Sequence, residues 1–143
     1  MSTLTSANSI FTLGCIPLYP VAVRIQDFAA DDMFTSEEVE MGETVMGADG
    51  HLSAGYTPYK VPLEFTLMPT SASNIIMDLI MDYQDAQQEL MEFNASIMIS
   101  SIGMTYVFSK GYFPKGSPMP AAKKIMQPRK FRLEFNKIYR TPI

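Results

Sequence analysis

The sequence predicts a mainly β domain of the α+β class, a sandwich or partial barrel with one flanking helix. Short runs in which apolar residues alternate with polar ones recur along the chain, and this period of two is typical of half-buried strands. Helical spacing appears in one stretch only, after Pro69. Of the 143 residues, 47% are hydrophobic, which is enough for one core. We therefore expect a single domain over residues 1–143.

Six or more strands are expected after a polar, flexible arm at residues 1–9. Val61, Leu63, Phe65 and Leu67 alternate with more polar neighbours and give the clearest strand. A turn at residues 47–51, rich in glycine, predicts a hairpin, because glycine adopts the backbone angles that tight turns need. The expected strands are 10–16, 21–28, 38–46, 52–56, 61–68, 95–102, 104–113 and 129–138, and residues 114–120 are expected to form a loop.

The expected helix begins near Ser71 or Ser73, whose hydroxyls suit a helix N-terminus. Its apolar face is predicted to hold Ile76, Leu79, Ile80, Tyr83 and Leu90. A second face carries only acids, namely Asp78, Asp82, Asp85, Glu89 and Glu92. Like charges at this spacing repel, and acids near the C-terminus oppose the helix dipole. The stripe is either a solvated face or the target of a basic partner.

Charge is divided along the chain. Eight acids and no base lie between residues 27 and 49, whereas nine bases and one acid lie between 110 and 140. The two segments either neutralise each other within one subunit or join the acidic surface of one copy to the basic surface of the next. The net charge of −4 argues against tight binding of nucleic acid, whose binders usually carry a basic excess.

The sequence offers little support for a catalytic activity. Cys15 is the one cysteine and His51 the one histidine, and Cys15 lies in an apolar run that does not activate a thiol. No zinc ligand set, P-loop or dinucleotide motif occurs. The chain also lacks a secretory signal and an apolar run long enough for a membrane helix. We expect no enzyme activity, cofactor, metal or membrane contact, and synthesis in a reducing cytoplasm.

Two longer patterns point to a family. The first comprises residues 28–32 followed by 39–55, with the glycine-rich segment 47–55. The second is an alternating strand that ends in 69–73, then a helix, a hairpin, and the segments 120–124 and 127–131. The sequence resembles the tail tube proteins of contractile-tailed bacteriophages in these residues and in the order of these elements. The resemblance covers nearly the whole chain.

The resemblance implies a tail-tube-type β-sandwich with a flanking helix. Six copies would form a ring, and stacked rings would form a tube for DNA ejection. The implied partners are other copies, a sheath, a tape measure protein, a baseplate and a tail terminator, with transient passage of DNA. The location would be the virion tail, after synthesis in the bacterial host. The alternatives are a connector, terminator or baseplate ring protein of the same β family, or an enzyme or ligand carrier on a β-barrel.

By the same resemblance, residues 29–43 would be the loop that reaches the neighbouring ring. The candidate ring-stacking residues are Asp31, Asp32, Glu37, Glu38, Glu40, Glu43, Lys123, Lys124 and Arg129. The hairpin and the strands at 61–68 and 129–138 would supply the lumen barrel, with Asp49, Glu64, Thr66, Lys130, Arg132 and Glu134 facing the lumen. The acidic helix stripe of Asp78, Asp82, Asp85, Glu89 and Glu92 would face a sheath.

Overall fold

A computed structural model describes residues 9–15, 18–26, 28 and 34–143 of the chain. Within these ranges, nine strands and one helix confirm the mainly β class. The expected arm lies almost wholly outside the described residues, as do Asp31 and Asp32. The elements are β1 (Ile10–Cys15), β2 (Tyr19–Ile25), β3 (Phe34–Thr35), β4 (Gly42–Met46), β5 (Leu52–Tyr56), β6 (Val61–Leu67), α1 (Ser73–Gln87), β7 (Phe93–Ile99), β8 (Met104–Gly116) and β9 (Arg129–Pro142).

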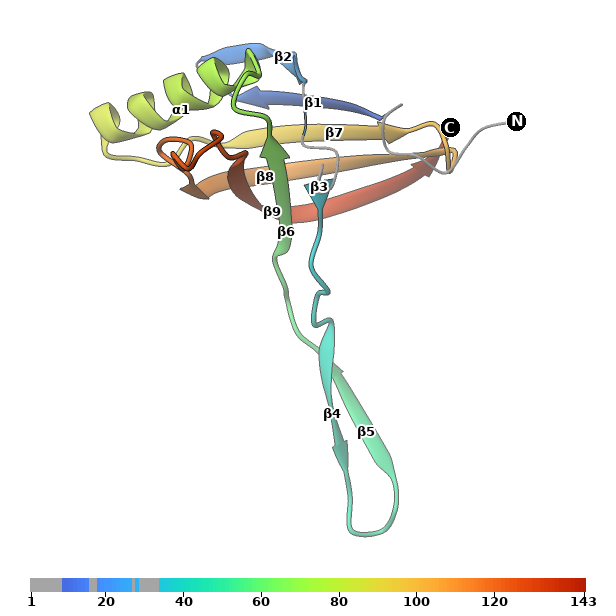
Figure 1. Cartoon of the computed structure of the whole chain (residues 1–143). Coiled ribbons are helices and arrows are strands. Elements are labelled where there is room, and N and C mark those ends of the chain that lie inside the picture. The colour runs from blue at the N-terminus through green and yellow to red at the C-terminus, as the bar shows by residue number, and fades with distance from the viewer. Residues whose placement is uncertain (1–8, 16–17, 27, 29–33) are drawn as a thin grey trace.

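Seven strands form one antiparallel sheet in the order β2-β1-β7-β8-β9-β6-β3. The remaining two, β4 and β5, pair only with each other and form a hairpin that projects from the sheet (Figure 1). Within the subunit, this hairpin does not extend the sheet that contains β6 and β9. The resemblance implies a lumen barrel that contains both the hairpin and these two strands. The extended segments 36–41 and 57–60 separate it from the sheet and form its stalk.

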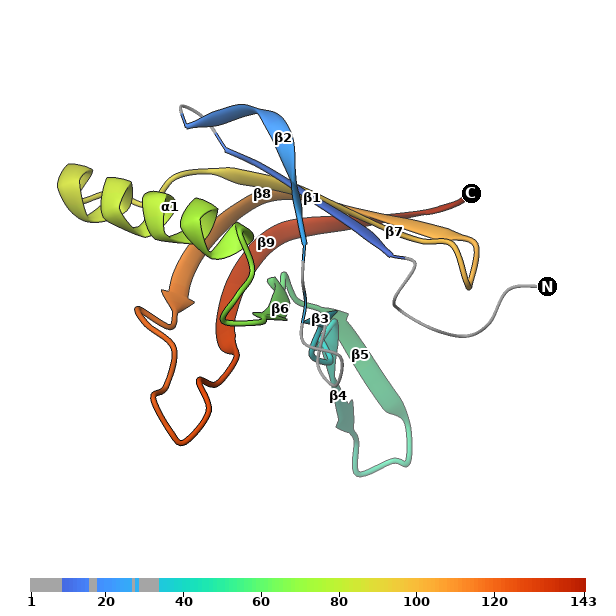
Figure 2. The same cartoon turned by 45° about the horizontal axis from the view of Figure 1, so that its top comes forward.

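One face of the curved sheet forms the core. In the register of β6 with β9, Phe65 lies opposite Phe131 and Leu63 opposite Leu133, and all four side chains are buried. Helix α1 packs against this face through Met77 and Ile80, neither of which is exposed (Figure 2). The inward positions of Phe131, Leu133 and Phe135 agree with the sequence pattern.

The helix begins one turn after β6 and is fixed to the end of β2. Ser71 Oγ donates a hydrogen bond to Gln26 O at 2.7 Å, and Gln26 N donates to Ser73 Oγ at 2.9 Å. Ser71 Oγ also accepts from Ser73 N at 3.2 Å. The expected cap at Ser71 or Ser73 was wrong, because the N-cap residue is Ala72, which makes no side-chain capping hydrogen bond. The predicted apolar face was wrong at Leu79, which is about half exposed because the buried side centres on Met77 and Ile80. It was also wrong at Leu90, which is about half exposed and lies beyond the end of the helix at Gln87.

Strand β8 is longer than its sequence indicates, since it continues through Pro114 to Gly116. The predicted loop start at 114 is therefore wrong. The register with β9 shifts between Tyr112 and Lys115, and such an irregularity accepts a proline that a regular ladder would exclude. Farther back, Gly111 lies opposite Phe135, whose ring occupies the space that a side chain at 111 would need.

Candidate assembly surfaces

The β4–β5 hairpin is built by a tight turn of the glycine-rich segment. Gly47 N donates to His51 O at 2.8 Å, and Gly50 N donates to Gly47 O at 3.0 Å. Gly50 has φ +84°, a left-handed conformation that favours glycine. Asp49 Oδ1 accepts a hydrogen bond from His51 N at 3.2 Å. The hairpin turn that the glycine-rich pattern at residues 47–51 predicts is therefore confirmed.

One face of the hairpin is apolar and exposed. Directly opposed residues of an antiparallel pair point to the same side, so Met46 and Leu52 share a face with the opposed pair Thr44 and Ala54 and with Tyr56. The exposed fractions are 63% for Met46, 62% for Leu52 and 73% for Tyr56. An isolated two-stranded hairpin is marginally stable in water. A projecting hairpin with such a face is typical of a contact with another protein.

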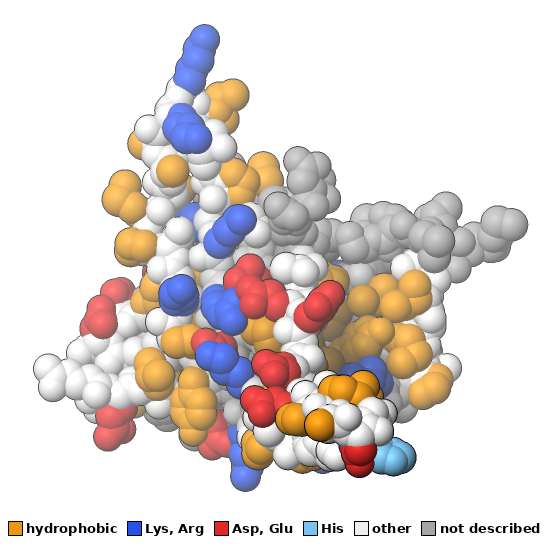
Figure 3. All heavy atoms as spheres, turned by 90° about the horizontal axis from the view of Figure 1, so that it is seen from below, with side chains coloured by type: hydrophobic (Ala, Val, Ile, Leu, Met, Phe, Trp, Pro, Cys, Tyr) orange, Lys and Arg blue, Asp and Glu red, His pale blue; other side chains and the backbone are white. Residues whose placement is uncertain are grey.

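Charged residues join the hairpin stalk to the sheet. Arg132 Nη1 in β9 lies 2.8 Å from Glu37 Oε1 in the stalk and 2.7 Å from Glu64 Oε1 in β6. The hydrogen bonds to Glu37 and Glu64 raise the pKa of Arg132, so it remains charged. Ser36 Oγ also donates to Pro62 O at 2.6 Å. Figure 3 shows acidic and basic side chains side by side near the base of the hairpin.

The ring-stacking candidates do not form one surface in the subunit. Glu37 is bound to Arg132, whereas the acids Glu38, Glu40 and Glu43 are exposed around the stalk. Lys123 and Lys124 are exposed in the connection between β8 and β9. The acidic and basic segments therefore neutralise each other partly within one subunit, through the Glu37–Arg132 pair.

Arg129, another stacking candidate, is buried within its own subunit, with 4% of its side chain exposed. It binds Asp78 of the helix at 2.6 Å and donates to Ser117 O at 2.8 Å. Its guanidinium therefore serves an internal contact. Within the predicted sheath-facing stripe, Asp78 carries this ion pair, whereas Asp82, Asp85, Glu89 and Glu92 are exposed. The predicted helical positions of Glu89 and Glu92 were wrong, because α1 ends at Gln87.

Five of the six lumen candidates share the sheet face opposite the core. Glu64 lies opposite Arg132, and Thr66 opposite Lys130, while Glu134 lies two residues along β9 on the same side. Arg132 pairs with Glu64 across the two strands, and Lys60 Nζ lies 2.7 Å from Glu134 Oε2. Thr66 is buried, whereas Asp49 lies apart from the others in the hairpin turn.

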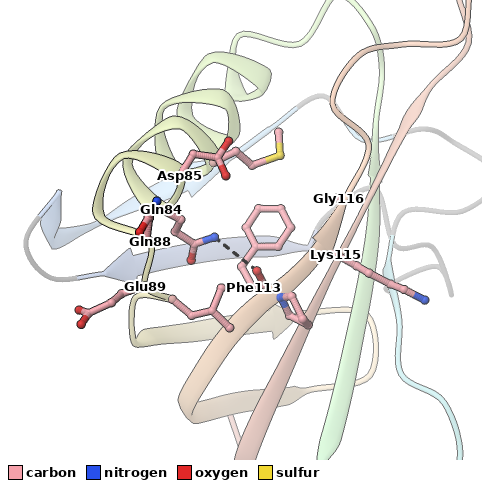
Figure 4. A pocket seen from close by; sticks show the side chains of 10 residues that line it. Gln84, Asp85, Gln88, Glu89, Phe113, Lys115 and Gly116 are labelled. Atoms are coloured by element: carbon pink, nitrogen blue, oxygen red, sulfur yellow. Dashed lines mark hydrogen bonds between the residues drawn. The ribbon is translucent and has the colours of Figure 1, made fainter.

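A groove that the sequence did not reveal lies between the second half of α1 and the end of β8 (Figure 4). It has a volume of about 690 Å³. Phe113 and Met81 line its apolar part, and Asp85 of the helix and Glu89 just after it line its acidic part. Gln84 Nε2 donates to Phe113 O at 3.4 Å and holds the two walls together. Only the tertiary pairing of β8 brings Phe113 beside the helix.

Cys15 and His51 lie in separate elements, β1 and the hairpin turn. Burial raises the pKa of the Cys15 thiol, which is 2% exposed. Among the described residues, no group of three or more His, Cys, Asp or Glu side chains is placed to hold a metal ion. No helix in the described part is both long and apolar enough to cross a membrane.

Comparisons with known proteins place the fold among contractile systems. A family described as "Tail fiber protein gp32" matches residues 2–139. A search of curated protein sequences finds no match. The structure is similar to the sheath/tube terminator of an extracellular contractile injection system called PVC, with a TM-score of 0.61, 8% identity, and coverage of 99% of this chain and 98% of that chain.

Two further solved structures have the same fold. The tube terminating cap of the anti-feeding prophage has a TM-score of 0.62 at 9% identity, over 100% of this chain and 93% of that chain. A chain of the anti-feeding prophage baseplate has a TM-score of 0.57 at 14% identity, over 99% of this chain and 98% of that chain. At these identities the likeness concerns the fold, and it confirms a tail-tube-type architecture.

Proposed function

The chain belongs to the tail fiber protein gp32 family, and from this premise we propose that it is a structural protein of a contractile tail that assembles with copies of itself. The single observation that carries the proposal is the β4–β5 hairpin, whose apolar face is fully open in the subunit. Burying one such side chain stabilises a contact by roughly 1.5–3 kcal/mol. Met46, Leu52 and Tyr56 together supply an apolar surface for such a contact.

The edges of the sheet support the same role. β2 pairs on one side only, and β6 pairs fully with β9 but on its other side only with Phe34, Thr35 and Phe28 among the described residues. Exposed edges favour pairing with further strands, and closure of a barrel across copies removes them. We propose that six copies close a ring in this way and that stacked rings form the tube.

In this assembly the hairpin of one copy reaches the neighbouring ring, and the exposed acids Glu38, Glu40 and Glu43 at its stalk face that neighbour. The face with Glu64, Lys130, Arg132 and Glu134 lines the lumen. DNA leaves through the lumen without tight binding, because a chain with net charge −4 attracts phosphates weakly. The exposed acids of α1 face a sheath. A tape measure protein, a baseplate and a terminator complete the particle, in which the chain is structural rather than enzymatic.

A second candidate is a protein that forms one ring at the end of a tube or in a baseplate. The names of two similar structures, a sheath/tube terminator and a tube terminating cap, favour it. Both candidates place the chain in a virion or a related extracellular particle. Electron microscopy of the purified protein separates them, because a tube protein forms long hollow tubes and a terminator or baseplate protein forms single rings.

The variant L52K tests the role of the hairpin. We expect it to stay monomeric in sedimentation velocity at concentrations where the original chain assembles, because a charge would enter the apolar contact. Its circular dichroism is expected to be unchanged, since Leu52 is 62% exposed in the subunit. The matched control is S53K, in the next residue and on the opposite face of the hairpin.

Assembly of L52K at the original concentration would contradict the hairpin contact. An original chain that remains monomeric at high concentration would contradict self-assembly altogether. Loss of assembly in S53K but not in L52K would assign the contact to the other face of the hairpin and overturn the proposal as stated.

A further inference from the structure

The connection between β8 and β9, residues 117–128, forms an ordered projection that we call the tongue. Its base is closed by a hydrogen bond from Ser117 N to Lys130 O at 3.0 Å and by Arg129, which binds Ser117 O. Nearer its tip, Ala122 and Met126 form an antiparallel bridge, and Gln127 N donates to Ala121 O at 3.0 Å. These contacts hold the tip, residues 123–125, in a defined turn.

The tip of the tongue is both basic and apolar. Lys123 and Lys124 are exposed, and so are Ile125 (76%) and Met119 (63%). Residues 117–128 contain no acid. No carboxylate in the described ranges forms an ion pair with either lysine. Such a tip fits a partner that offers an apolar surface beside carboxylates.

The groove between α1 and β8 offers this combination. Phe113, which is buried, and Leu90, which is 52% exposed, line its apolar part. Asp85 in the last turn of the helix and Glu89 just after its end line the acidic side, and the helix contains no lysine or arginine. Lys115 also lines the groove, but its side chain points away from Asp85 and Glu89 (Figure 4). A bound cation would be favoured at the C-terminal end of α1, because Asp85 in the last turn opposes the helix dipole.

We propose that the tongue of one copy occupies the α1–β8 groove of a second copy. Ile125 covers Leu90 and Phe113, and Lys123 and Lys124 pair with Asp85 and Glu89. This inference rests on the proposed self-assembly and identifies a second contact for it. The acids of the stalk fit the tongue less well, because Lys60 and Arg132 lie among them.

The tongue does not fill the groove of its own subunit. Arg129 fixes the base of the tongue near Asp78, and the tip projects away from the helix (Figure 2). A contact between two different surfaces of the chain is heterologous, so each copy can donate one tongue and accept another. In Figure 1 the hairpin projects downward from the sheet, whereas the tongue, the orange-red loop after β8, lies at the left. Because the hairpin is proposed to reach the next ring, the tongue contact would join neighbours within a ring.

A mixture of two variants that each carry one added cysteine tests the contact directly. I125C in the tongue is mixed with L90C in the groove, the two carrying tags of different size, and the mixture is oxidised. We expect a disulfide-linked heterodimer, because a disulfide needs Cα atoms about 6 Å apart. Cys15 is 2% exposed and contributes little background. The matched control replaces L90C by I75C, which is exposed in the first turn of α1 and does not line the groove.

Charge exchange provides an independent readout. The pair K123E/K124E and the pair D85K/E89K are each expected to weaken self-association by about tenfold or more, and their mixture is expected to regain it. A heterodimer with I75C in place of L90C, or no recovery in the mixture, would overturn the proposal. Loss of DNA binding in K123E/K124E with unchanged self-association would also overturn it.

The cross-link in the L52K background separates the two contacts. A heterodimer that persists there while larger assemblies are lost supports both the tongue contact and the hairpin contact. If larger assemblies persist in L52K while the I125C–L90C heterodimer forms, the hairpin proposal fails and the tongue proposal stands. An I125C–L90C disulfide within one chain carrying both substitutions, without the intermolecular product, would show that the groove receives its own tongue and would overturn the inference.

Discussion

Arg129 Nη2 lies 2.6 Å from Asp78 Oδ1, and this pair ties the first residue of β9 to the middle of the single helix. The Arg129 guanidinium also lies 5.1 Å from the centre of the Phe131 ring. One side chain thus joins the helix, the base of the tongue and the sheet. Because Arg129 is buried and Asp78 is about half exposed, the arginine depends on this pair more than the aspartate does.

Replacing Arg129 is therefore expected to cost stability. R129A removes charged hydrogen bonds to Asp78 and Ser117, and we expect the free energy of unfolding to fall by about 2 kcal/mol. Urea denaturation measures this change. The control R140A removes an exposed arginine and is expected to change stability by less than about 0.5 kcal/mol. Equal effects of the two variants would show that the buried contact contributes no stability.

Acid is expected to weaken the attachment of the stalk. The hydrogen bond from Lys60 lowers the pKa of Glu134, with a smaller contribution from Arg132. Because the folded pKa lies below the unfolded one, this stabilisation is present at neutral pH and is lost as the pH falls below about 4.5. Unfolding midpoints across the acid range are expected to fall less steeply in E134Q. A profile of E134Q parallel to that of the original chain would contradict this linkage.

Replacing Gly111 even by alanine is expected to lower the stability of the fold. A Cβ at this position would collide with the buried ring of Phe135, and such overpacking typically costs about 1–3 kcal/mol. Thermal unfolding of G111A is expected to show this loss. G55A is the matched control, because a Cβ there meets no atom within 4 Å. A G111A variant as stable as G55A would mean that the Phe135 ring moves aside freely.

Several features were predictable from the sequence because they depend on neighbours along the chain. Alternation at Val61, Leu63, Phe65 and Leu67 predicted β6, since the period of two is a local property of a strand. The glycines of segment 47–51 predicted the hairpin turn. The resemblance in these segments also led to the tail-tube-type fold that the similar structures share.

Other features depended on which elements meet. The spacing of Leu79 matched a buried face, yet it is exposed, because helical period alone does not determine which side packs on a sheet. Leu90 matched the same spacing, but the helix ends before it at Gln87. The lysines of the tongue and the acids of α1 were visible in the sequence. The groove in which Phe113 lies beside Asp85 forms only because β8 pairs over a long stretch with β9.

By itself, the sequence determined the class of the fold, the single helix, the turn of the hairpin and the division of charge. The tertiary structure decided how each charge is used. It placed Glu37 against Arg132, buried Arg129 against Asp78, and left Lys123 and Lys124 exposed. The physical reason is that an ion pair depends on distance in space and on exposure to water, and both are fixed only when strands far apart in the chain pair with one another.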